Sequence, residues 1–152
     1  MKHFLASLLA GIGAFTGILC LAYFDHSVWD ATLLMAPFGA TAVLVFGLPK
    51  SPLAQAKNVI FGHLITAFIG VFFVQYVGVG VWQLALASGL GVTSMLFTKT
   101  THPPAGANPI LIMLSGQSWL FLLTPVLAGS IIIVLLGKVV REAQTRLSAE
   151  LN

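Results

Sequence analysis

The sequence predicts an all-α integral membrane protein made of two inverted repeats, each with three membrane segments. Three observations lead to this fold class: an apolar composition, an internal repeat, and a one-sided distribution of positive charge. Of the 152 residues, 58% are hydrophobic and 7% are charged, whereas an average soluble domain has about 25% charged residues. So few charges do not cover the surface of a soluble protein. We therefore expect the lipid bilayer to be the main solvent of one single-domain unit.

The internal repeat appears when the sequence is shifted by 67 residues against itself. Gly11–Gly70 then aligns with Gly78–Gly137 without a gap, and 14 of the 60 positions are identical. Residues that constrain the backbone are prominent among them, namely Gly11/Gly78, Gly13/Gly80, Pro37/Pro104, Gly39/Gly106, Gly62/Gly129 and Gly70/Gly137. Repeated halves in a membrane protein commonly enclose a binding site between them. Repeat 1 covers about residues 4–77 and repeat 2 about residues 78–138.

The expected membrane segments follow from the apolar runs. They are residues 4–24, 28–48, 59–77, 79–98, 105–115 and 119–137, followed by a polar cytoplasmic tail at 139–152. A helix of about 20 residues spans the roughly 30 Å of hydrocarbon. Pro37 interrupts the second run, and the fifth run, after Pro103 and Pro104, covers only about 17 Å as a helix. A cleaved signal peptide at the N-terminus is the alternative for the first run, which is longer than a signal core.

Charge placement tests this segment count. If each repeat crosses three times, all Lys and Arg residues fall on one side: Lys2, Lys50, Lys57, Lys99, Lys138, Arg141 and Arg146. The positive-inside rule then predicts that both termini are cytoplasmic. Because three crossings per repeat is an odd number, the second repeat is inverted relative to the first. These charges indicate topology rather than nucleic-acid binding, and the lone Cys20 offers no disulfide framework or metal cluster. No cofactor is expected.

The two interrupted segments are the expected binding site. Pro104 suits the first position of a helix, so the amides of Ala105, Gly106 and Ala107 are expected to lack intrahelical partners. A helix N-terminus has roughly half a positive charge and favours anions. Inversion of the repeats would bring the helix start at Pro37 to a similar depth in the membrane. Such matched interruptions are the sequence signal of a transporter site.

The candidate residues flank these two helix starts. The expected substrate-binding residues are Lys99, Thr101, His102, Ala105, Gly106, Ala107 and Asn108 in repeat 2, and Phe38, Gly39, Ala40 and Thr41 in repeat 1. His63, inside the third segment, is a candidate for proton relay, since ionisable residues are costly in lipid. Structural alternatives stay open for each: a proline kink, a glycine packing contact, a surface loop for His102, a snorkelling side chain for Lys99, and a neutral histidine at position 63.

The motifs resemble those of the HPP family, small integral membrane proteins named after a His-Pro-Pro motif. The matching stretches are Thr101–Ala107, Ala36–Ala40, Ser51–Gln55, Asn58–Ile60 and Gly62–His63. The resemblance covers about Ala36 to Gly137. Members in plastids and photosynthetic bacteria are associated with nitrite transport, so the resemblance implies a small inorganic anion as substrate. The family is often described with four membrane segments, which fits four long spans plus two interrupted ones.

The leading functional hypothesis is a transporter of a small anion, with nitrite favoured by the resemblance, in a bacterial inner membrane. Proton coupling through His102 or His63 is an option because an unperturbed imidazole titrates near about pH 6.5. An anion channel and a structural or regulatory membrane subunit are the alternatives. An enzyme is not expected, because the sequence shows no nucleophile with an acid–base pair and no metal cluster. Six short segments enclose little interior, so we also expect a homo-oligomer such as a dimer.

Overall fold

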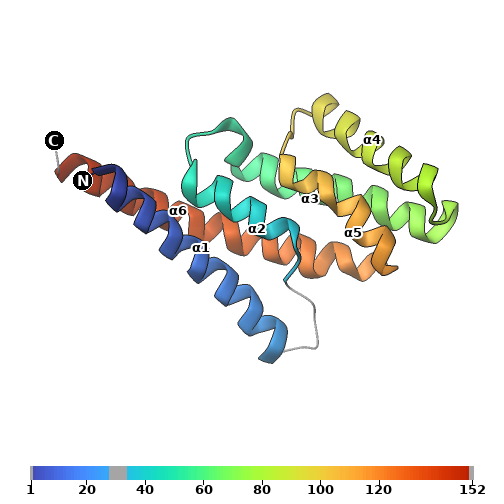
Figure 1. The fold of residues 1–152 in the computed structure, drawn as a ribbon, viewed down its shortest axis with the longest axis horizontal. Helices are drawn as coiled ribbons and strands as arrows, with labels where there is room; N and C mark the ends of the chain where they lie inside the picture. The colour runs from blue at the N-terminus through green and yellow to red at the C-terminus, as the bar shows by residue number, and fades with distance from the viewer. Residues whose placement is uncertain (1, 28–33, 151–152) are drawn as a thin grey trace.

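The computed structural model describes residues 2–27 and 34–150, and its main elements are six α-helices (Figure 1). They are α1 (Lys2–Ser27), α2 (Pro37–Ala42), α3 (Ala56–Phe72), α4 (Val81–Phe97), α5 (Asn108–Ser115) and α6 (Ala128–Glu150). Tighter or wider helical turns extend several of them: Val43–Gly47 after α2, Phe73–Val77 after α3, η4 (Pro103–Ala107) before α5, and Trp119–Leu122 with Leu123–Leu127 before α6. One further short turn, Pro52–Ala54, precedes α3.

The helices fall into long and short classes, as the sequence predicts. His3–Tyr23, Ala56–Val77 and Trp119–Leu147 are long and apolar enough to cross a membrane, and α4 is slightly shorter at 17 residues. The two short stretches are Pro37–Gly47, which contains α2, and Pro103–Ser115, which contains η4 and α5. We call these two stretches the half-helices. The first part of the expected segment 28–48 includes residues 28–33, which lie outside the described residues.

Proline and glycine set the limits of the half-helices and the bends between the long helices. Pro37 is in the first turn of α2, where its missing N–H costs nothing. Gly116 ends α5 in the left-handed conformation at φ 66°. Gly78 has φ 97° at the bend between the turn after α3 and the start of α4. Both bends fall at the expected segment boundaries, between 59–77 and 79–98 and between 105–115 and 119–137. The polar tail is helical but is not a separate element, because α6 continues without interruption to Glu150.

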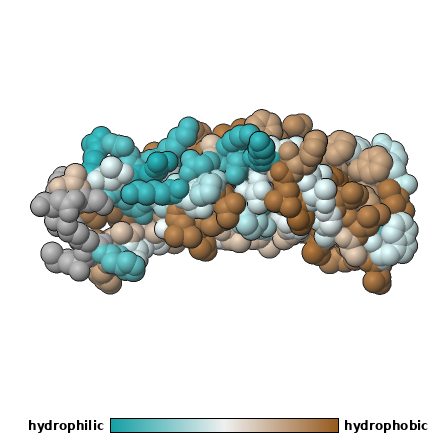
Figure 2. Space-filling model, turned by 90° about the horizontal axis from the view of Figure 1, so that it is seen from above, coloured by the Kyte–Doolittle hydropathy of each residue, from teal (hydrophilic) through white to brown (hydrophobic). Residues whose placement is uncertain are grey.

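The helix directions alternate along the long axis of the molecule (Figure 1). Helices α1, α3 and α5 run one way, α2, α4 and α6 run the other way, and both termini lie at the same end. The half-helices begin near the middle of this axis and run towards opposite ends (Figure 1). On the face shown in Figure 2, hydrophilic side chains lie along the half that is nearer the termini, up to the middle of the molecule, while the other half is mainly hydrophobic.

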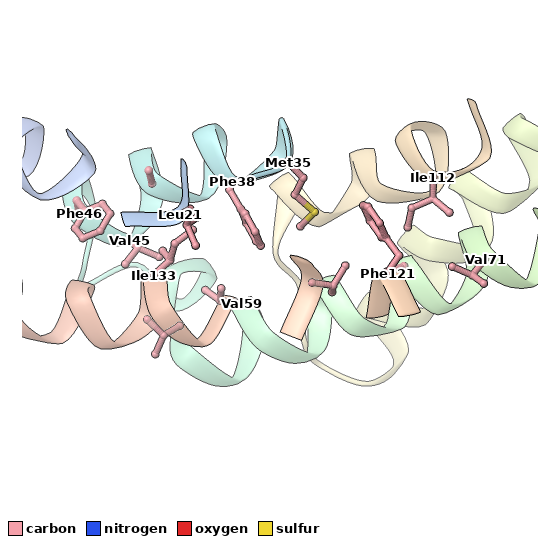
Figure 3. Close-up of a cluster of buried hydrophobic side chains, with 14 residues drawn as sticks. Leu21, Met35, Phe38, Val45, Phe46, Val59, Val71, Ile112, Phe121 and Ile133 are labelled. Carbon is pink, nitrogen blue, oxygen red and sulfur yellow. The ribbon is translucent and has the colours of Figure 1, made fainter. Parts of the chain in front are cut away.

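A buried apolar cluster fills the space between α1, α2, α3, α5 and α6 (Figure 3). Its fully buried side chains include Leu21, Phe38, Phe46, Val59, Val71, Ile112 and Ile133. In lipid such clusters stabilise a fold by close van der Waals packing, which small residues permit by letting helices approach closely. Exposed apolar side chains cover the outer faces of α1 and α4, as expected where lipid is the solvent.

Two glycines let the long helices pack closely against the half-helices. Gly70 on α3 lies against α5, where an added Cβ would be 3.1 Å from the Cβ of Ile112. Gly137 on α6 lies against Val45 in the half-helix of α2. Gly70 and Gly137 are equivalent positions in the 67-residue shift, and so are Val45 and Ile112. Helices α3 and α6 thus each pack on one half-helix through residues that correspond in the 67-residue shift.

Candidate functional site

A cluster of buried polar side chains lies where the two half-helices begin beside α3. Thr41 comes from α2, His63 from α3, His102 from the residue before η4, and Asn108 from the start of α5. All four residues have 0% of their surface exposed. We call these four residues the polar junction. Polar groups are costly in an apolar interior unless they are hydrogen-bonded, so their partners define what the junction can do.

The Thr41 hydroxyl is the centre of the polar junction. Its Oγ1 lies 2.8 Å from His63 Nε2 and 3.0 Å from His102 Nε2. The same oxygen lies 3.1 Å from the carbonyl oxygen of Pro37 in the preceding turn. The two imidazole rings are edge to face, with their centroids 5.0 Å apart. Phe38 covers His63 from the α2 side at a centroid distance of 5.2 Å. One hydroxyl therefore joins both histidines and both halves of the chain.

The far side of each histidine is also bonded. His102 Nδ1 lies 2.8 Å from the carbonyl oxygen of Leu53, and His63 Nδ1 lies 3.0 Å from Asn108 Nδ2. The Asn108 nitrogen is also 3.1 Å from the His63 carbonyl and 3.0 Å from Thr66 Oγ1. Asn108 Oδ1, in contrast, is buried without a hydrogen-bond partner among the described residues.

The loop that presents His102 is fixed to the start of α3. The Asn58 amide donates to the carbonyls of Pro52 and Thr101 at 3.0 and 3.1 Å. Gly62 allows close approach, because an added Cβ would lie 2.9 Å from both His102 Cβ and the Thr100 carbonyl oxygen. The His-Pro-Pro motif and the 51–63 stretch are thus parts of one packed unit, although they lie about 40 residues apart in the sequence.

The expectation of unpaired amides at the helix starts is wrong. The Ala105 N–H donates to the His102 carbonyl at 3.0 Å, and the 3-10 geometry of η4 pairs the amides of Gly106 and Ala107 three residues back. The Phe38 and Gly39 amides likewise donate to Met35 and Ala36 carbonyls at 2.9 and 3.1 Å. Tight turns thus satisfy these groups within the chain, so a ligand site here depends on side chains.

The remaining candidate residues lie around the polar junction rather than in it. Ala105 is buried beside it, Thr101 is half-buried with its carbonyl held by Asn58, and Gly106 is half-buried. Gly39, Ala40, Ala107 and Lys99 are exposed. The structure therefore brings together Phe38, Thr41, His63, His102 and Asn108, and it leaves Lys99 at the surface after α4. Among the described residues, no hydrogen bond or ion pair links the Lys99 side chain to the polar junction.

The sequence-based analysis missed three contributors to the site. The Thr66 hydroxyl oxygen accepts a hydrogen bond from the Asn108 side chain, and the Leu53 carbonyl accepts one from His102 Nδ1. The Asn58 side chain donates to the Thr101 carbonyl and so holds the His102 loop. Thr66 lies one helical turn after His63, a spacing that places both residues on one helix face. This spacing could have identified Thr66 as a neighbour of His63 from the sequence alone. A backbone carbonyl such as that of Leu53 leaves no trace in the residue type, so sequence reasoning has no means of finding it.

Comparison with known proteins places the chain in a family. A family model described as the HPP transmembrane region matches residues 2–149. The chain belongs to the HPP family of membrane proteins. Two transmembrane proteins of Dictyostelium discoideum are 36% and 39% identical to it in alignments of 140 residues that cover 85% of this chain. These alignments cover 45% and 49% of the relatives, so this HPP family member spans about half their length. No solved structure matches the chain.

Proposed function

We propose that this HPP family member transports a small inorganic anion, with nitrite as the favoured substrate, through a site at the polar junction. The observation that supports this most is the junction itself: two half-helices begin there, and two buried histidines share one hydroxyl. Ionisable side chains inside a membrane domain typically mark substrate or ion pathways. Paired interrupted helices near the middle of a repeat protein typically form the transport site.

The architecture supports an inverted-repeat transporter with both termini in the cytoplasm. Helix directions alternate, and each repeat has an odd number of segments, so the second repeat runs opposite to the first (Figure 1). The matched contacts of Gly70 with Ile112 and of Gly137 with Val45 fit a two-fold relation between the repeats. In this proposal the two repeats move relative to each other and open the polar junction to one side of the membrane at a time.

The junction attracts an anion through side-chain and helix-terminus electrostatics. The partial positive charge of a helix N-terminus resides mainly on its unpaired N–H groups, and the first amides of both half-helices are paired, so side chains supply most of the attraction. Protonated His102 adds a full charge directly before η4. The contacts proposed for the anion are His102, Asn108 and Thr41, with the backbone at Phe38–Ala40 and Ala105–Ala107 close by. In this proposed role the polar junction binds and releases the anion without changing it chemically.

Uptake of isotope-labelled nitrite into proteoliposomes tests the proposal. We expect uptake above protein-free liposomes with an inward pH gradient, and strong loss of uptake in His102→Gln. The matched control is His3→Gln, the same change at an exposed position on α1, which should keep wild-type uptake. Absence of uptake at every pH gradient would reject nitrite as substrate. Equal uptake by His102→Gln and the wild type would remove the polar junction from the pathway.

Two features of the mechanism have separate tests. In a carrier, unlabelled nitrite on the inside accelerates the entry of labelled nitrite, because the site returns loaded, whereas a channel conducts current under voltage without such acceleration. Native mass spectrometry in detergent gives the number of copies, for which we propose a homo-oligomer such as a dimer in a bacterial inner membrane. A protein that assembles only with another subunit and moves no anion would instead fit a structural or regulatory role.

A further inference from the structure

The hydrogen-bond partners fix the protonation pattern of the polar junction when both histidines are neutral. The Leu53 carbonyl is only an acceptor, so His102 Nδ1 carries the proton and its Nε2 accepts. Thr41 then donates its hydroxyl proton to His102 Nε2 and accepts from His63 Nε2–H. His63 Nδ1 accepts from Asn108 Nδ2. The two histidines are thus opposite tautomers in one directed chain that runs from Asn108 to Leu53.

The orientation of Asn108 is itself determined by its neighbours. Its Nδ2 faces the His63 carbonyl and Thr66 Oγ1, and the Thr66 hydroxyl donates to the Gly62 carbonyl at 2.8 Å. Both neighbours are acceptors, so the nitrogen has to be on this side. The buried Oδ1 remains without a described partner as a result. Asn108 therefore points an N–H donor at His63 Nδ1. A proton added at His63 Nδ1 would face this donor and could not form a hydrogen bond with it.

His102 responds differently to an added proton. A proton bound at its Nε2 points at Thr41 Oγ1, which has two lone pairs and can accept from both histidines. The Thr41 hydroxyl then turns to the Pro37 carbonyl, 3.1 Å away. In this second pattern the three contacts of Thr41 Oγ1, with His63, His102 and Pro37, each still pair a donor with an acceptor, without movement of any heavy atom. The junction is therefore prepared for one extra proton on His102 and not for one on His63.

We propose that His102 is the proton-binding site of the junction, that rotation of the Thr41 hydroxyl from His102 to the Pro37 carbonyl accommodates the proton, and that His63 stays neutral as a positioning residue. This deepens, and in its transport consequence rests on, the anion-transport function proposed above. A proton from solvent forms the new N–H bond, and the resulting imidazolium is the charge that an anion needs in this buried place. Anion and proton therefore bind together, and the pair is electrically neutral.

The groups that face His102 support this choice. From α3 the titratable neighbour is His63, from α2 the neighbour is the Thr41 hydroxyl, and from the 52–54 turn it is the Leu53 carbonyl. Lys57 and Lys99 are exposed, and the described carboxylate of Glu142 pairs with Arg146 on α6. Among the described residues no carboxylate contacts the His102 imidazole, so in this proposal the bound anion serves as the counterion.

Nitrogen-15 NMR of histidine-labelled protein in nanodiscs tests the proton site without any transport assay. We expect neutral His102 to be the Nδ1–H tautomer and neutral His63 to be the Nε2–H tautomer, with assignments from single His→Gln variants. On titration between about pH 8 and pH 5, His102 should become imidazolium while His63 keeps its neutral pattern. Protonation of His63 first, the reverse tautomers, or no protonation of His102 in this range would each overturn the proposal.

Calorimetric titration with sodium nitrite, in two buffers of different ionisation enthalpy, tests the coupling. We expect uptake of one proton per nitrite bound by the wild type and by Thr41→Ser, which keeps the hydroxyl. Thr41→Val, of nearly equal size, should lose this proton uptake. Nitrite binding without proton uptake in the wild type would refute the coupling and leave anion transport standing. If nitrite does not bind, the proposed function fails, and the NMR titration alone decides the proton site.

Discussion

The close contact between Gly62 and the His102 loop makes a quantitative prediction for Gly62→Ala. The new Cβ would lie 2.9 Å from His102 Cβ and 2.9 Å from the Thr100 carbonyl oxygen. Both atoms belong to parts of the chain held by Asn58 and Leu53, so the loop has to move. Overpacking of this kind costs about 1–3 kcal/mol. Alanine in a helix is itself better than glycine by about 0.5–1 kcal/mol, which offsets part of the loss.

Gly89→Ala on α4 is the matched control, because an added Cβ there meets nothing within 4 Å. Both variants gain the same helix propensity, so their difference isolates the overpacking. We expect Gly62→Ala to be less stable than Gly89→Ala by about 1–3 kcal/mol, which is about 5- to 150-fold in the unfolding equilibrium. Unfolding by denaturing detergent in mixed micelles measures this difference. Equal stability of the two variants would show that α3 does not approach the His102 loop as closely as described.

Three further predictions follow from single contacts. Asn58→Ala removes two hydrogen bonds that fasten the His102 loop, so it should lower the free energy of unfolding by about 1–3 kcal/mol in the same assay; no loss would mean that the loop is held elsewhere. Gly78→Ala places a side chain at φ 97° and ψ 177°, a conformation essentially restricted to glycine, and should cost about 1–3 kcal/mol; an unchanged unfolding midpoint would contradict this. Lys99→Ala, at an exposed position, should retain more labelled-nitrite uptake than His102→Gln; the opposite order would bring Lys99 back into the site.

Much of the helix plan could be predicted because it depends on local chemistry. Apolar length determines α1, α3 and α6, while Pro37 and the Pro103–Pro104 pair determine where the half-helices begin. Gly78 and Gly116 mark turns that require positive φ. The extent of α6 was harder to foresee, since a polar surface helix and the end of a membrane helix have the same residue pattern. The structure shows one continuous helix.

The four residues of the polar junction are among the candidates, but how they bond to one another could not be predicted. Repeat symmetry and the cost of ionisable groups in lipid point to Thr41, His63, His102 and Asn108 as candidates. The amide prediction failed because η4 begins with 3-10 turns, which pair amides three residues back. An α-helical start would have left those amides without partners. Sequence also gives no basis for placing one hydroxyl between two imidazoles, because that depends on how α2 meets η4 in space.

The most direct test asks whether the Thr41 hydroxyl governs transport. It compares the accumulation of labelled nitrite, driven by a pH gradient, among the wild type, Thr41→Ser and Thr41→Val. We predict accumulation in the first two proteins and none above the outside concentration in the third. Accumulation by Thr41→Val at the wild-type level would contradict the account.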